Sequence, residues 1–169
     1  MIYMQSQEDL NSAMESEVLG ELLFLTAAKH TKSCEQQYKW NLLATLETQT
    51  LERLQIYLQQ NGQTTFVRSH IKLQAKISGL AMAKLPWKLA MHLLKQGTNP
   101  FIKVFERMDY KADRHSQDFF KYLLAHEYAI AEFARLELKG ESTKSIKPVF
   151  NLIEKKSDFS NLNNKKIRM

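Results

Sequence analysis

Three glutamates stand at positions where a helical repeat of this chain should be apolar. Glu21, Glu47 and Glu127 each share one helical face with apolar residues three, four and seven positions away. A carboxylate that is removed from water needs a partner charge, a proton or a metal ion. Because the three residues fall in three different expected helices, a helical bundle would bring them to one interior. The spacing therefore predicts an interior carboxylate site of the kind that holds metal ions or small ligands.

The same spacing has a second interpretation, in which the glutamates form a buried polar network without chemistry. Buried carboxylates occur in proteins when a cation or a hydroxyl group pairs with them. Side chains that could pair with Glu47 and Glu127 in this way are Arg135, Lys39, Tyr38 and Tyr57. The sequence leaves both interpretations open.

The chain is expected to be all-α. It has only five glycines and three prolines, and no run of alternating β-branched residues lies between them. Asn61-Gly62 and Gly140 are typical helix stops. Proline and glycine at residues 97–100 predict a bend or break in the fourth helix, where a ligand could enter. The expected helices span residues 7–32, 35–60, 66–84, 86–110 and 113–139, with a short one over 148–153.

Length and composition limit the class of protein. The 169 residues fit one helical bundle domain over residues 1–156, followed by a flexible basic tail over 157–169. The single cysteine, Cys34, cannot form an internal disulfide. The first residues soon turn polar and acidic, unlike a signal peptide, and no apolar run approaches the ~18 residues of a membrane span. We therefore expect a cytoplasmic protein.

The charge balance bears on the choice of partner. A net charge of +6 and an isoelectric point of about 9.3 would fit nucleic acid. However, half of the basic excess lies after residue 153, and no expected helix combines a dense basic face with exposed aromatic residues. Nucleic acid is therefore not the expected partner. No glycine-rich phosphate loop, serine nucleophile motif or Cys/His pair supports a kinase or hydrolase.

The second and fifth expected helices resemble the ferritin-like superfamily, which includes rubrerythrin. The resemblance covers roughly residues 10–140. It implies a ferritin-like up-down four-helix bundle with an additional short helix and, in metal-bearing members, a diiron centre. The resemblance is carried by Trp40, Leu43, Ala44, residues 46–50 and Leu54 in the second helix, and by residues 125–127, 131–134 and 137–138 in the fifth.

Carried over by position, Glu21 or Glu17 would match the first-helix ligand of that family, Glu47 the second-helix glutamate and Glu127 the last-helix glutamate. The chain departs from the family pattern where its Glu-x-x-His motifs would place histidines. Thr50 and Ile130 occupy those two positions.

Two histidines elsewhere in the chain are relevant, because Thr50 and Ile130 provide no imidazole. His126 is adjacent to Glu127, and adjacent side chains diverge by about 100° around a helix, so the two cannot ligate as a Glu-x-x-His pair. We expect His126 to be exposed, and the alternative is that it donates a hydrogen bond to a metal ligand. His92 has apolar neighbours on the fourth helix and falls near the level of Glu127, where it could supply an imidazole. The alternative for His92 is a core or surface histidine with a hydrogen-bond partner. The predicted metal ligands are therefore Glu21, Glu47, His92 and Glu127, which suit iron, manganese or zinc.

Two functions follow from these residues and from the resemblance. The first is a metal-dependent, diiron-type oxidoreductase or small-ligand protein whose interior glutamates hold iron or manganese. The second is a non-enzymatic helical interaction protein that binds no metal, because Thr50 and Ile130 replace the histidines. A homodimer suits either function, whereas a membrane partner is not expected.

Overall fold

The computed structural model describes residues 6–153, and this part of the chain is helical, with no strand. The all-α prediction is confirmed. The predicted basic tail lies outside the described residues. The helices are α1 (Gln7–His30), α2 (Cys34–Gln60), α3 (Ser69–Lys84), α4 (Trp87–Tyr110), α5 (Gln117–Leu138) and α6 (Ser142–Ser145), and residues 147–153 are also helical.

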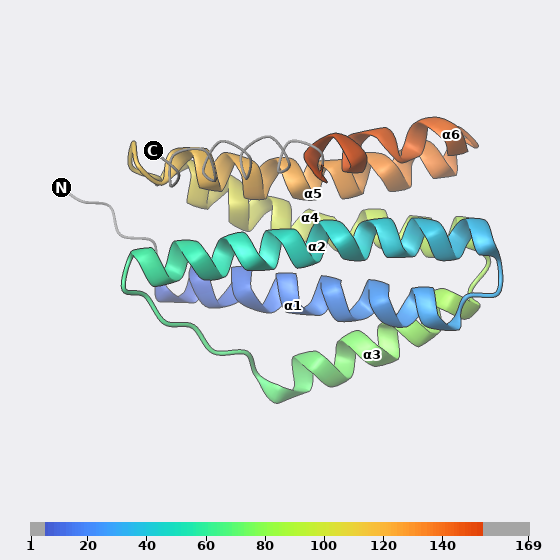
Figure 1. Cartoon of the computed structure of the whole chain (residues 1–169), viewed down its shortest axis with the longest axis horizontal. Coiled ribbons are helices and arrows are strands. Elements are labelled where there is room, and N and C mark those ends of the chain that lie inside the picture. Colours follow the sequence, from blue (N-terminus) through green and yellow to red (C-terminus); the bar gives the residue numbers. More distant parts are fainter. Residues whose placement is uncertain (1–5, 154–169) are drawn as a thin grey trace, which may run out of the picture.

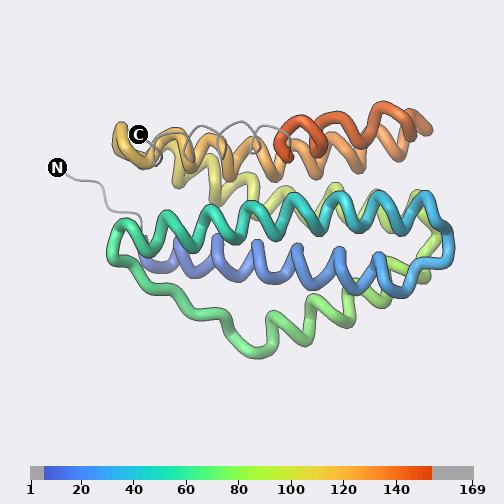
Figure 2. The backbone as a smooth tube through the Cα atoms, in the orientation of Figure 1, coloured from blue at the N-terminus to red at the C-terminus, as the bar shows by residue number. Residues whose placement is uncertain are grey.

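Four long helices form two antiparallel hairpins. α1 pairs with α2 and α4 pairs with α5, and the hairpins face each other through α1 with α4 and α2 with α5 (Figure 1). α3 packs along α1 and runs in the same direction as α1 (Figure 2). The connection between the hairpins therefore crosses the length of the molecule, and α2 and α4 run in the same direction.

Local sequence explains where most helices begin and end. The Ser6 hydroxyl accepts a hydrogen bond from the backbone N–H of Asp9 at 3.1 Å and so caps α1. Gly62 and Gly140, with φ of 61° and 78°, follow α2 and α5 in the left-handed conformation that glycine favours. The predicted helix stops are therefore confirmed.

Two predicted helix starts are wrong by several residues. α5 begins at Gln117 rather than near Asp113, because the Asp113 carboxylate accepts the backbone N–H of Ser116 at 2.8 Å and holds a turn there. α3 begins at Ser69 rather than near residue 66. Just before it, the backbone and guanidinium of Arg68 both donate to the Glu15 carboxylate on α1, which fixes the connecting segment.

The predicted break in the fourth helix is also wrong. α4 continues from Trp87 to Tyr110 with Pro100 inside it. Proline removes one backbone donor, but a long helix that packs along one side can tolerate the loss of a single hydrogen bond. Near the proline, the Thr98 hydroxyl donates to the carbonyl of Lys95 at 2.9 Å.

The apolar core divides into two clusters, one toward each end of the hairpins. One contains Trp40, Met91 and Phe133, and the other contains Leu54 and Phe105, among other fully buried residues. Between them the helices place buried polar side chains at a similar level. This middle polar layer consists of Glu17 on α1, Glu47 and Thr50 on α2, Thr98 on α4, and His126 and Glu127 on α5.

The packing of α3 on α1 depends on a glycine. A Cβ atom at Gly79 would lie 2.5 Å from the carbonyl oxygen of Leu23 and 2.7 Å from the Cβ of Thr26. We expect Gly79→Ala to lower the free energy of unfolding by about 1–3 kcal/mol, as overpacking does. Urea denaturation measures this change.

Gly97 of α4 provides the matched control, because a Cβ atom there would meet nothing within 4 Å. Gly97→Ala should raise the free energy of unfolding by about 0.5–1 kcal/mol through helix propensity alone. Equal stability of the two variants would contradict the close approach of α3 to α1.

Candidate metal centre

The folded chain brings together Glu17 of α1, Glu47 of α2 and His126 of α5. His126 Nε2 lies 3.1 Å from Glu47 Oε2 and 3.6 Å from Glu17 Oε2. One ligand atom from each residue lies within 4.8 Å of the other two. Glu17 and His126 are fully buried, and Glu47 is 4% exposed. We call these three residues the Glu/Glu/His cluster.

The spacing of the cluster fits one metal ion. Oxygen and nitrogen ligands lie about 2.0–2.2 Å from a first-row divalent ion, so ligand atoms at octahedral or tetrahedral angles are about 2.8–3.6 Å apart. The two separations from His126 Nε2, 3.1 and 3.6 Å, both match that range. Carboxylate oxygen and imidazole nitrogen suit iron, manganese and zinc.

The cluster has unsatisfied polar atoms. Glu17 Oε2 and His126 Nδ1 are buried without a hydrogen-bond partner within residues 6–153. The Ser16 hydroxyl donates to the other Glu17 oxygen at 3.3 Å, which is a long hydrogen bond. No lysine or arginine pairs with a carboxylate of the cluster in the described chain. A carboxylate that is buried without an ion-pair partner is unstable unless it binds a cation or a proton.

The buried carboxyl groups have perturbed pKa values. Burial raises the pKa of Glu17 well above its ordinary value, although His126 partly opposes this shift. Burial raises the pKa of Glu47 to about 8, and the nearby Glu21 adds to the increase. Burial also raises the pKa of Glu127 well above its ordinary value. Without a bound cation, these groups therefore hold their protons far more tightly than carboxyl groups in water do.

Gly20 makes room for the Glu47 carboxylate. A Cβ atom at Gly20 would lie 2.6 Å from Glu47 Cδ and still closer to Glu47 Oε1. α1 thus presents bare backbone where the α2 carboxylate turns toward the cluster. Because Gly20 has no side chain, the Glu47 carboxylate can occupy a position from which any larger residue at position 20 would exclude it.

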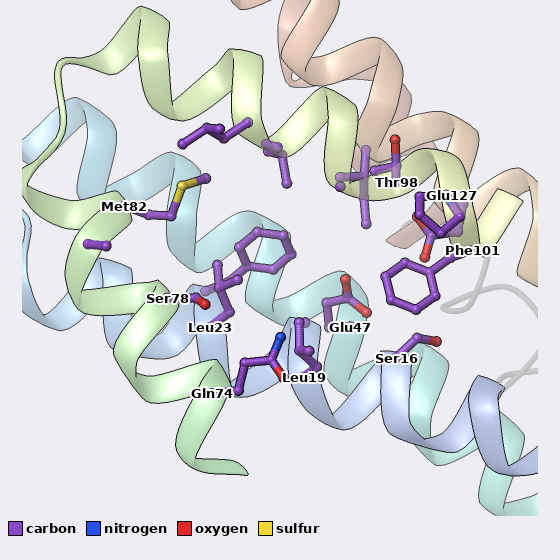
Figure 3. A pocket seen from close by; sticks show the side chains of 18 of the residues that line it. Ser16, Leu19, Leu23, Glu47, Gln74, Ser78, Met82, Thr98, Phe101 and Glu127 are labelled. Carbon is purple, nitrogen blue, oxygen red and sulfur yellow. The ribbon is translucent and has the colours of Figure 1, made fainter. Parts of the chain in front are cut away.

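A cavity of about 480 Å³ adjoins the cluster between α1, α3 and α4 (Figure 3). Most of its lining is apolar, with Leu23, Met82 and Phe101 among the larger side chains. Glu47 and Glu127 are the charged residues of this lining. A volume of this size accommodates a small organic molecule. An apolar ligand in the cavity would therefore lie against two carboxyl groups.

The predicted ligands have different positions in the structure. Glu47 belongs to the cluster, and Glu127 lies on the cavity wall, 5% exposed. Glu21 is half-buried and accepts a hydrogen bond from the Thr48 hydroxyl at 2.6 Å. His92 is exposed on α4 and contacts the Gln96 amide at 3.0 Å. The structure does not bring His92 to the cluster, because α4 turns it outward.

The expectation that His126 is exposed is wrong, because it is fully buried. The apolar face of α5 is wide enough to bury two adjacent positions. Leu123, Ile130 and Phe133 lie three, four and seven residues from His126, and all three are buried. This spacing is the sequence signal that identifies His126 as an interior residue. The imidazole therefore comes from beside Glu127, not from a Glu-x-x-His motif.

Thr50 and Ile130, at the positions where the resemblance implies histidines, are also interior. The Thr50 hydroxyl donates to the backbone carbonyl of Leu46 at 2.9 Å and lies 3.0 Å from the Tyr122 hydroxyl. Ile130 lines the cavity. Thr50 thus joins a hydrogen-bond chain beside the cluster, and Ile130 contributes apolar surface.

The alternative network predicted for Glu47 and Glu127 does not form. Lys39 pairs with Glu137 at 2.7 Å and with Glu35 at 2.8 Å, and Arg135 pairs with Glu132. The Tyr57 hydroxyl lies 3.2 Å from the Ser116 hydroxyl, and Tyr38 is 52% exposed. Lys39, Arg135 and Tyr57 therefore interact with other side chains, and none of these four residues forms an ion pair or hydrogen bond with the Glu/Glu/His cluster.

Two further observations bear on the class of protein. Within the described chain, none of the helices combines the length and the apolar character needed to cross a bilayer. Comparisons with protein-family models, with curated proteins and with solved structures give no match for this chain.

Proposed function

We propose that this protein binds one divalent transition-metal ion at Glu17, Glu47 and His126 and acts as a metal-dependent oxidoreductase on a small apolar ligand. The observation that carries the proposal is the convergence of three buried ligand atoms within 4.8 Å. The unpaired oxygen of Glu17 gives it further support. A metal ion would neutralise carboxylates that no described lysine or arginine reaches.

The topology supports a ferritin-like interpretation of the fold. Ferritin-like proteins join two helical hairpins by one long crossover and direct carboxylates inward. Here α3 and the segment before it form such a crossover, and Glu17, Glu47 and Glu127 point into the interior. Three convergent ligand atoms favour a single ion over the diiron pair that the resemblance implies. Glu127 stands beside them as a further carboxylate.

The cavity supports the choice of ligand. A bound ion would supply Lewis-acid or redox chemistry at the inner wall of the cavity. The apolar lining favours an apolar molecule, and the Glu127 carboxyl group can hold or release a proton there. The reaction would therefore take place in a mostly apolar cavity with the proton-carrying Glu127 close by.

Metal analysis tests the proposal directly. Protein purified without chelators should contain about one equivalent of iron, manganese or zinc, because a site with three protein ligands retains its ion. Elemental analysis by mass spectrometry measures this content. Less than about a tenth of an equivalent, together with no uptake on titration, would rule out the metal site.

A non-enzymatic helical interaction protein is the second candidate function. The observation that favours it is the high pKa of Glu47, about 8, because a protonated carboxyl group can remain buried without a cation. This candidate predicts that Glu47→Gln leaves folding and partner binding unchanged. Stoichiometric metal in the wild-type protein would contradict it.

A further inference from the structure

One face of α3 carries an apolar stripe that no described residue covers. Leu73, Ile77 and Leu80 lie at helical spacing and are 62%, 59% and 37% exposed. Ala75 and Gly79, which are buried on the α1 side, point in the opposite direction around the helix. α3 is therefore apolar on two opposite faces, and only one of them has a partner within residues 6–153.

The chain around this stripe is basic. No aspartate or glutamate occurs between Glu52 and Glu106. Four lysines of α3 and of the start of α4 are exposed, and none of them forms an ion pair in the described part of the chain. These four are Lys72, Lys76, Lys84 and Lys88. Together, the stripe and the four lysines define what we call the α3 face.

The cavity opens beside the same face. Leu93 of α4 lines the cavity and is 42% exposed, so it lies at the rim. Leu89, one turn earlier, is 45% exposed. Gln74 and Ser78 on the flank of α3 line the opposite wall, and α3 and α4 diverge from their connection with these residues between them (Figure 3). The cavity therefore lies on the flank of α3, beside the α3 face.

We propose that the α3 face docks on the surface of an anionic phospholipid bilayer. The aliphatic side chains of the stripe enter the boundary between headgroups and acyl chains, and the lysines pair with lipid phosphates. A helix that lies in the interface needs no membrane-spanning segment, so the finding that no helix within residues 6–153 could cross a bilayer does not conflict with this partner. The docking does not rest on the metal site, and either can fail without the other.

The charges and side-chain types favour this partner over two others. A second copy of the chain would bring two sets of unpaired lysines together, which repel. Single-stranded nucleic acid would require aromatic side chains for stacking, whereas the stripe is leucine and isoleucine. Exposed aliphatic side chains beside unpaired lysines match the surface of an anionic bilayer, which has charged headgroups on the outside and apolar acyl chains beneath them.

Vesicle co-sedimentation of the full chain tests the docking. We expect binding to phosphatidylcholine vesicles that contain about one quarter phosphatidylglycerol, and at least about tenfold weaker binding to phosphatidylcholine alone. The triple variant Leu73→Ser, Ile77→Ser, Leu80→Ser and the triple variant Lys72→Gln, Lys76→Gln, Lys84→Gln should each lose about tenfold or more in affinity. Leu73 and Ile77 are largely exposed and Leu80 is 37% exposed, so both variants should keep the wild-type circular dichroism spectrum at the temperature of the assay.

Matched controls remove the same residue types from elsewhere on the surface. Leu25→Ser with Ile56→Ser, and Lys29→Gln with Lys32→Gln and Lys121→Gln, should bind vesicles like the wild type. Equal losses in these controls, or no binding of the wild type to anionic vesicles, would overturn the proposal. It would also be overturned if the stripe variant abolished a dimer, or if the chain bound oligonucleotides tightly but not vesicles.

Discussion

Glu17→Gln is expected to weaken metal binding by about 100-fold or more, because it removes one of three ligands from a buried site. The amide is nearly the same size as the carboxyl group, so the helices need not move. Without metal, the variant should be as stable as the wild type at pH 8 or more stable. The reason is that Glu17 Oε2 has no partner and burial has raised the pKa of Glu17. Competition titration with a chromophoric chelator and thermal melting in chelator measure the two effects.

Glu21→Gln is the matched control for this variant. Glu21 lies one helical turn further along α1, half-buried and hydrogen-bonded to Thr48. Its substitution should change the metal affinity by less than about threefold, because it contributes no atom to the cluster. If Glu21→Gln lost the metal and Glu17→Gln kept it, the ligand on α1 would be Glu21, as the sequence predicts.

The stability of the metal-free protein is expected to fall as the pH rises from 5 to 8. The pKa of Glu47 is raised to about 8, and those of Glu17 and Glu127 are also raised. Stability from such groups is complete below their ordinary pKa near 4.5 and is lost as the pH rises through the folded-state pKa. The melting temperature should therefore drop by roughly 10 °C in this range.

A saturating metal ion should reverse this trend. Metal replaces the protons on the ligands, so binding strengthens as the pH rises, and an ion present at about 100 times its dissociation constant adds about 2.7 kcal/mol of stability. Melting curves at pH 5 and 8, with chelator and with metal, measure the effect. Asp9 and Glu15 do not offset it, because their arginine partners lower their pKa values and both are ionised throughout this range. A metal-free melting temperature that rose with pH would contradict the buried neutral carboxyl groups.

Much of the fold could be predicted from the sequence because helix signals are local. The glycine stop after α2 and the period of apolar residues locate α1 and α2 to within a few residues. The start of α5 was missed because of a local turn, in which the Asp113 carboxylate accepts the backbone N–H of Ser116. The start of α3 was missed because Arg68 is held by Glu15, 53 residues away. Periodicity within one helix carries no information about such contacts.

The candidate site could be predicted only in part, for a similar reason. Glu47 was identified because it shares one helical face with apolar residues three, four and seven positions away. Glu17 and Glu21 are four residues apart on the same side of α1, so spacing cannot choose between them. That choice depends on how α1 is placed against α2, where Gly20 receives the Glu47 carboxylate. His126 was missed because the width of a buried face depends on how many neighbours a helix has.

The division of the core into two apolar clusters has a consequence for how such a site can evolve. Because the long helices are held on both sides of the middle polar layer, a residue in that layer can change without releasing either end. One polar residue of the layer can then be exchanged for another while the backbone arrangement persists. In this architecture the polar side chains of the layer can change more readily than the scaffold, so the fold constrains where a buried site can lie more tightly than which residues form it.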